Sequence, residues 1–213
     1  MADSRLYVHV LLDRSGSMES CRDKTIEAFN DYVTSLKEQS TAGTRVSLTT
    51  FDTESTDLVF DAVRITGMPK LTREMFIPRG GTPLFDAVAA VVARIDKVTL
   101  LADERVALTI LTDGQENASR EMTAEAVRKM LMDRQERHNW LVQYLGANQD
   151  AWQAGAQIGI AAHATMDFSV ASVRPAMQSV AASAQRFRRA AVEDAREAAT
   201  FTPEERASAK GRS

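Results

Sequence analysis

The chain has 213 residues, and its 26 Lys plus Arg nearly balance its 29 Asp plus Glu. This balance excludes a strongly basic protein that binds nucleic acid or a membrane through overall charge. The length fits one domain with a single sizeable core. No apolar stretch is long enough to cross a bilayer, and residues 6–12 are too few for a secretory signal, so we expect a cytoplasmic protein. Cys21, the one cysteine, excludes an internal disulfide, and we interpret it as a small buried hydrophobe.

Short β-rich segments occur along most of the chain. Six of them are predicted to be strands: residues 6–12, 45–51, 58–63, 106–111, 141–145 and 164–168. The first and fourth are nearly continuous apolar runs, which is typical of central strands covered on both faces. The second and third are separated by a polar turn too short for a crossover helix, so we expect an antiparallel hairpin at one sheet edge.

The segments between most strands have helical periodicity. Two apolar faces recur at this spacing: Ile26, Phe29, Val33 and Leu36, and then Leu84, Val88, Val91 and Ile95. Residues 123–138 and 150–158 predict two further helices. Strands that alternate with helices predict an α/β fold, doubly wound and Rossmann-like, with a mainly parallel central sheet and one antiparallel edge strand.

The end of the chain has a different composition. An Ala- and Arg-rich segment carries apolar side chains at heptad-like spacing: Val173, Met177, Val180, Ala184 and Phe187. This face predicts a helix that packs on the domain, and a surface for a partner helix is the alternative. We therefore divide the chain into a main domain over residues 1–170, a helical extension over 171–200 and a polar, frayed tail over 201–213.

The most informative motif follows the first predicted strand, where the sequence reads Asp13-x-Ser15-x-Ser17. Residues two apart in an extended loop project to the same side, so these three side chains can present oxygens to one point. Hydroxyls, a carboxylate and water suit a hard divalent cation such as Mg²⁺. Taken alone, the motif is equally well read as a polar strand-to-helix loop in which Ser17 caps the helix.

Two later segments favour the metal interpretation. Thr82 follows two glycines at the start of a predicted helix, and Asp113 ends the buried strand over residues 106–111. Singly, they are a helix start and an Asp-Gly turn. In open α/β sheets, however, ligands bind beyond the carboxyl ends of the strands, and all three segments supply oxygens to that edge.

At these residues the chain resembles the von Willebrand factor type A (vWA) domains that carry a metal-ion-dependent adhesion site. All five signature positions are matched, by Asp13, Ser15, Ser17, Thr82 and Asp113, and the resemblance covers residues 6–168. The sequence is also similar to stand-alone bacterial members, including those associated with tellurite resistance. The resemblance implies direct ligands from both serines and Thr82, with the aspartates acting largely through waters. It implies Mg²⁺, with Mn²⁺ or Ca²⁺ as alternatives.

The resemblance further implies that an Asp or Glu of a partner protein completes the coordination of the metal. Arg14 and Arg79 would favour the same anionic group, although ordinary solvated charge is the simpler interpretation of both. By association alone, the partner would be a chaperone-like ATPase or a kinase or phosphatase system, with a role in stress response. We expect neither nucleic acid nor membrane as a partner.

We expect a binding module and not an enzyme. A metal-dependent, phosphatase-like hydrolase is one alternative, but Ser15 stands where that chemistry prefers a second aspartate. A scaffold that acts through the C-terminal helix is the other. His9, His138 and His163 have no spacing that suggests zinc, and we interpret them as structural.

Overall fold

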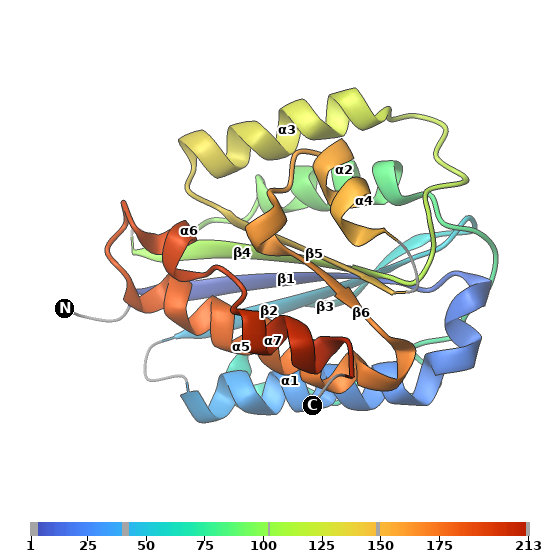
Figure 1. Cartoon of the computed structure of the whole chain (residues 1–213), viewed down its shortest axis with the longest axis horizontal. Helices are drawn as coiled ribbons and strands as arrows, with labels where there is room; N and C mark the ends of the chain where they lie inside the picture. The colour runs from blue at the N-terminus through green and yellow to red at the C-terminus, as the bar shows by residue number, and fades with distance from the viewer. Residues whose placement is uncertain (1–3, 40–42, 102, 148–149, 212–213) are drawn as a thin grey trace.

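Six strands form one twisted sheet in the order β3-β2-β1-β4-β5-β6 (Figure 1). The structure, a computed structural model, describes residues 4–39, 43–101, 103–147 and 150–211. The strands are β1 (Arg5–Asp13), β2 (Thr44–Phe51), β3 (Thr56–Arg64), β4 (Glu104–Thr112), β5 (Leu141–Ala147) and β6 (Thr165–Phe168). All neighbours are parallel except β2 and β3, which form the predicted antiparallel hairpin at the edge.

Helices cover both faces of the sheet. The α-helices are α1 (Arg22–Gln39), α2 (Leu84–Ile95), α3 (Ala124–Arg137), α4 (Ala151–Gln157), α5 (Val173–Arg189), α6 (Ala195–Ala198) and α7 (Pro203–Ala209). Short 3₁₀ turns are η1 (Gly16–Cys21), η2 (Ile65–Gly67), η3 (Ala162–Ala164) and η4 (Val170–Ser172). In Figure 1, α1, α5, α6 and α7 lie on one side of the sheet and α2, α3 and α4 on the other. The predicted doubly wound α/β fold is confirmed.

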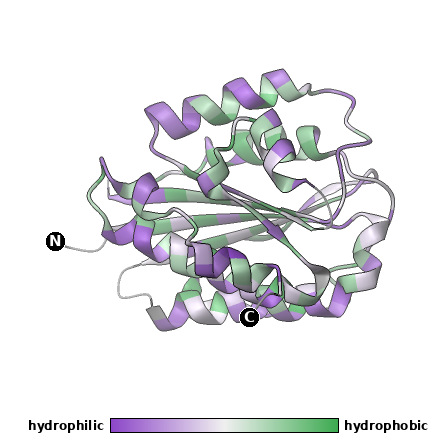
Figure 2. Cartoon of the chain, viewed as in Figure 1, coloured by the Kyte–Doolittle hydropathy of each residue, from purple (hydrophilic) through white to green (hydrophobic). Residues whose placement is uncertain are grey.

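The core consists of two apolar layers, one on each face of the sheet. Alternate residues of β1 point to opposite faces, so Val8 and Val10 pack toward α1 while Tyr7 and Leu11 pack toward α2. Figure 2 shows the same arrangement, with hydrophobic strands between helices whose outer surfaces are largely hydrophilic. Among the residues that the structure describes, no helix has the length and apolar composition needed to cross a bilayer.

Helix α5 packs on the main domain, as the spacing of its apolar side chains predicted. Its buried apolar side chains are Val173, Ala176, Met177, Val180, Ala181, Ala184 and Phe187. They join the core layer on the α1 side of the sheet, and α5 packs directly against α1. A mainly parallel sheet needs both faces covered, and α5 shares one of these faces with α1. The apolar face of the predicted helical extension over residues 171–200 is therefore buried against the domain.

The prediction of a frayed tail over residues 201–213 is wrong, because most of this segment is ordered against the domain. Phe201 is buried, and Thr202 begins α7 with a capping box shared with Glu205. The guanidinium of Arg206 lies 4.8 Å from the ring centroid of Trp152 and donates to the carbonyl oxygen of Ala162 at 2.8 Å. The polar composition of this segment concealed these few specific contacts.

His9 lies at the centre of the sheet, as the structural interpretation predicted, and it is fully buried. Its Nε2 lies 2.8 Å from Oγ1 of Thr49, and its Nδ1 lies 3.4 Å from the hydroxyl of Tyr7. Tyr7 in turn lies 2.8 Å from Oγ of Ser47. Burial, with the nearby charge of Arg94, lowers the pKa of His9 to about 3, so the ring is neutral in the folded protein at physiological pH.

We expect this histidine to contribute to acid unfolding. The pKa of His9 is about 3 when folded and 6.5 when exposed, so its contribution to stability is present above pH 6.5 and is lost as the pH falls toward 3. Between pH 7 and pH 4 the loss is about 3 kcal/mol. Urea unfolding followed by circular dichroism should show that His9→Gln lacks this part of the decline. The exposed His138→Gln should behave as wild type, and an equal decline in His9→Gln would contradict this account.

Candidate metal site

Three loops meet at the carboxyl ends of the central strands, at the right-hand end of the sheet in Figure 1. The first begins at Asp13, the last residue of β1, and carries Ser15 and Ser17. The second precedes α2 and carries Thr82, and the third follows β4 and carries Asp113. Because β1 and β4 are adjacent and parallel, the first and third loops leave the sheet side by side. The fold therefore brings together all five residues that the sequence predicted.

Hydrogen bonds connect the serines and aspartates directly. The Oγ atoms of Ser15 and Ser17 are 3.1 Å apart, and Ser17 donates to Oδ1 of Asp113 at 2.6 Å. The backbone amide of Ser15 donates to Oδ1 of Asp13 at 2.7 Å. Asp13 and Ser15 are buried, while Ser17 is exposed. The cluster thus has a closed base and a side open to solvent. Ser17 does not cap the helix, which was the alternative interpretation, because its hydroxyl donates to Asp113 instead.

The position of Gly114 shows that the oxygens converge. A Cβ atom at Gly114 would lie 3.1 Å from Oγ1 of Thr82, 3.8 Å from Oγ of Ser17 and 3.9 Å from Oδ2 of Asp13. Thr82 is only 1% exposed, and its hydroxyl faces Gly114 beside the oxygens of Ser17 and Asp13. The hydroxyl is thus placed where a ligand bound between the loops would meet it.

The loop that carries Thr82 is fixed to its neighbours by the backbone. Gly16 donates its amide to the carbonyl oxygen of Gly80 at 3.0 Å, and Arg79 donates to that of Arg14 at 2.9 Å. Gly80 has a φ of +64°, and a Cβ there would lie 2.2 Å from Oγ1 of Thr53. Both the backbone conformation and the close approach therefore require glycine at this position.

Two further residues position the cluster and were not assigned a role from the sequence. The side-chain oxygen of Asn117 accepts a hydrogen bond from the backbone amide of Thr82 at 2.9 Å, and the backbone amide of Asn117 donates to the Thr82 carbonyl oxygen at 3.1 Å. Thr112 donates its hydroxyl to Oδ2 of Asp13. Thr112 could have been predicted to contact the site, because it lies at a buried strand end next to Asp113. Asn117 lies in a polar loop, and nothing in the sequence indicated its role.

Arg14 and Arg79 belong to an ion-pair cluster around Asp52. Nε of Arg14 donates to Oδ2 of Asp52 at 2.8 Å, and its NH2 group lies 2.9 Å from Oδ2 of Asp57. Its side chain is only 7% exposed, so the structure does not present Arg14 for the partner contact that we predicted. The Arg79 side chain is 40% exposed and pairs with Asp52 and Glu54. A partner contact through Arg79 stays a prediction.

The electrostatics of the site differ from those of the neighbouring ion pairs. Burial raises the pKa of Asp13 to about 6, although hydrogen bonds from Thr112 and Ser15 act in the opposite direction. Burial also raises the pKa of Asp113. No cation among the described residues contacts either carboxylate, whereas the carboxylate of Asp52 has two arginines. Two carboxylates near each other and without a cation favour a positively charged ligand.

The donor set fits a hard divalent cation. It consists of three hydroxyl and two carboxylate side chains, all oxygen, which is the preference of Mg²⁺ and not that of a soft metal. Across the described residues, no group of three or more His, Cys, Asp or Glu side chains is arranged to hold a metal. A metal at this edge of the sheet would thus depend on the hydroxyls of Ser15, Ser17 and Thr82.

Comparison with known proteins identifies the fold. No family model matches the sequence, and no curated protein matches it. Among solved structures, the chain is similar to a von Willebrand factor type A protein from Catenulispora acidiphila, with 14% identity and a TM-score of 0.59 over 87% of this chain and 43% of that one. It is also similar to the vWF domain of the pilus tip protein Mfa5 from Porphyromonas gingivalis, with 11% identity and a TM-score of 0.64 over 90% and 98% of the two chains.

A third similar structure is proximal thread matrix protein 1 from the mussel byssus, whose metal-ion-dependent adhesion site (MIDAS) motif is occupied by zinc. Its identity is 15% and its TM-score is 0.57, over 83% of this chain and 47% of that one. The chain spans less than half the length of the Catenulispora and mussel proteins. At these identities the likeness establishes the fold. The chain has the fold of von Willebrand factor type A domains, as the sequence motif predicted.

Proposed function

We propose that this domain binds a partner protein through a Mg²⁺ ion held by Asp13, Ser15, Ser17, Thr82 and Asp113. The observation that carries the proposal is the convergence of Thr82, Ser17 and Asp13 oxygens around Gly114. Asp13 and Ser17 come from one loop, Thr82 from a second and Gly114 from a third, and these loops are far apart in sequence. The zinc-occupied motif of the mussel protein supports a divalent ion in this fold.

In this proposal the hydroxyls of Ser15, Ser17 and Thr82 contact the ion directly, and the two aspartates act largely through waters. An ion with few direct carboxylates remains a strong acceptor for one more negative oxygen. An Asp or Glu of the partner would supply it. Ser17 is exposed, which leaves the site accessible from solvent. Mn²⁺ and Ca²⁺ remain alternative ions.

The surroundings of the site are consistent with a protein ligand. Ile77 and Met75, on the segment that leads to Thr82, are 52% and 41% exposed. Exposed apolar side chains on this segment would add contact area to a carboxylate interaction. We propose binding and no catalysis, because the described hydrogen-bond partners of Asp13 and Asp113 are hydroxyl and backbone groups. A chaperone-like ATPase or a kinase or phosphatase system as partner stays a prediction, as does a role in stress response.

Capture from native lysate tests the proposal. The immobilised chain should retain a partner in Mg²⁺ and release it when a chelator is added. Asp13→Ala should fail to capture it, whereas Asp23→Ala, at an exposed position on α1, should capture it normally. A partner that stays bound in chelator, or that binds Asp13→Ala equally well, would refute the metal-bridged mechanism.

We expect Mg²⁺ affinity to depend on pH. The ion competes with the proton on Asp13, whose pKa burial raises to about 6 in the metal-free protein. Affinity should be constant above about pH 7 and should fall about tenfold for each pH unit below 6. Titration calorimetry at several pH values measures this, and Asp13→Asn should reduce the dependence to the part contributed by Asp113, whose pKa burial also raises. Equal affinity of the wild type at pH 5 and pH 7 would contradict the assignment.

A further inference from the structure

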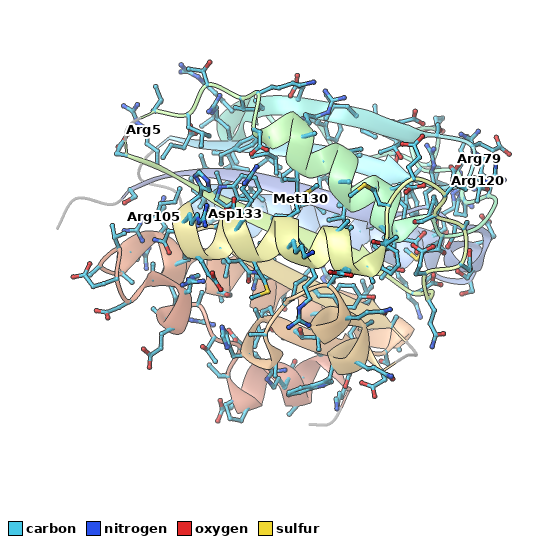
Figure 3. All side chains as sticks on the ribbon, turned by 90° about the horizontal axis from the view of Figure 1, so that it is seen from above. Arg5, Arg79, Arg105, Arg120, Met130 and Asp133 are labelled. Carbon is cyan, nitrogen blue, oxygen red and sulfur yellow. The ribbon has the colours of Figure 1, made fainter. Side chains whose placement is uncertain are left out.

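A cavity of about 430 Å³ lies at the end of the sheet opposite the metal site. It is bounded by the starts of β1, β2 and β4, the end of β3, and the end of α1. Figure 3 labels Arg5 at this end of the molecule and Arg79 at the other. Because the parallel strands begin here and the metal-site loops follow their far ends, the cavity is separate from the site described above.

Four cationic side chains line the cavity, against a single carboxylate. The cations are Arg5, Lys37, Arg45 and Arg64, and the carboxylate is Glu104. Such an excess is unusual in a chain whose formal net charge is −3. The carboxylate does not balance it, because Glu104 is already engaged by Arg45, whose Nε donates to Oε1 at 2.8 Å.

The remaining cations are largely unpaired. Arg5 lies 3.8 Å from Asp103, with both side chains about half exposed, which makes a weak pair. Within the described part of the chain, Lys37 and Arg64 have neither an ion pair nor a hydrogen bond from the side chain. Three positive groups from three different elements therefore border one cavity, and only Arg5 has a carboxylate near it.

The register of the sheet explains why Arg64 lies at this cavity. Arg45 and Arg64 are directly opposite each other in the antiparallel pair of β2 and β3. Because Arg45 is already paired with Glu104, no carboxylate of the lining is left for Arg64. An anion bound in the cavity would supply the missing negative charge. The hydroxyl of Thr66 and the half-exposed Leu101 complete the lining.

We propose that this cavity binds a small molecule that carries a phosphate group. Guanidinium groups form paired hydrogen bonds with phosphate oxygens, and arginine is the preferred residue for this purpose. The volume is in the range of small-molecule sites. Arg64, Arg5 and Lys37 bind the phosphate, and Leu101 contacts the organic part of the molecule.

Calorimetric titration of the full chain with inorganic pyrophosphate, without divalent metal, tests this proposal. The wild type should bind it saturably, and Arg64→Gln and Lys37→Gln should each weaken binding by at least about fivefold. Lys129→Gln, at a cation on α3 that is 75% exposed and distant from the cavity, should bind as wild type. The ligand-free Arg64→Gln protein should be as stable as wild type, because the exposed Arg64 side chain makes no described ion pair that the substitution would remove.

Three results would overturn the proposal. They are the absence of pyrophosphate binding, equal binding by Arg64→Gln, and an equal loss in Lys129→Gln. A separate experiment replaces pyrophosphate with vesicles of phosphatidylcholine and phosphatidylserine. Tight vesicle binding that pyrophosphate does not displace would assign the cavity to a membrane surface and not to a soluble phosphate compound.

Discussion

Replacing Thr82 with alanine is expected to weaken Mg²⁺ binding by about 100-fold and to abolish partner binding, with little change in thermal stability. The hydroxyl of Thr82 lies beside Ser17 and Asp13, where the proposed ion binds, so its removal costs the ion a ligand. The fold should persist, because the loop is held by backbone hydrogen bonds with Asn117 that alanine retains. Titration calorimetry of Mg²⁺ and thermal unfolding measure the two effects separately.

Thr82→Ser is the matched control, because it keeps the ligand atom and removes only a methyl group. It should retain most of the affinity. Asp113→Ala should resemble Thr82→Ala, and the double variant should be scarcely worse than either single one, as expected of groups that act through one ion. Wild-type affinity in Thr82→Ala, or a loss of equal size in Thr82→Ser, would show that the hydroxyl is not a ligand.

A chain that ends at Ser172 is expected not to fold cooperatively. It lacks α5, whose apolar side chains are buried against α1 and the sheet. Each such side chain contributes about 1.5–3 kcal/mol when buried, and a domain has a total stability of only about 5–15 kcal/mol. Circular dichroism during heating should show no sharp transition in the truncated chain.

Phe187→Ala examines the same interface in the full chain. The ring is completely buried in the α1 side of the core, and its loss should cost about 3–5 kcal/mol without preventing folding. A chain that ends at Lys210 retains α7 and should unfold as wild type does. If the chain ending at Ser172 unfolded cooperatively at the wild-type temperature, α5 would be an independent extension, and a scaffold function through that helix would become the better proposal.

The sequence was sufficient for the parts of the fold that depend on periodicity. Buried parallel strands need continuous apolar runs, and the segments that became β1 and β4 have them. The site was predictable for a related reason. Oxygen-bearing residues at the ends of such strands must meet at one edge of the sheet, so the order of residues alone was enough to place Asp13 and Asp113 together.

The features that the sequence did not predict depend on contacts between distant segments. The burial of Arg14 follows from Asp52 and Asp57, which lie on another strand pair, and nothing local distinguishes it from a solvated arginine. The role of Asn117 is similar, because it depends on a loop that returns to Thr82. Helix α5 and its packing on the domain were predicted from the spacing of apolar residues, but the spacing did not show that α1 and the sheet are what it packs against.

The central claim is that one divalent ion binds between these three loops, and a crystal structure grown in Mn²⁺ tests it most directly. Anomalous scattering from Mn²⁺ locates the ion without reference to the protein atoms. Our account predicts one strong peak at about 2.1 Å from the hydroxyl oxygens of Ser15, Ser17 and Thr82. A peak elsewhere on the surface, or none at this position at saturating Mn²⁺, would contradict it.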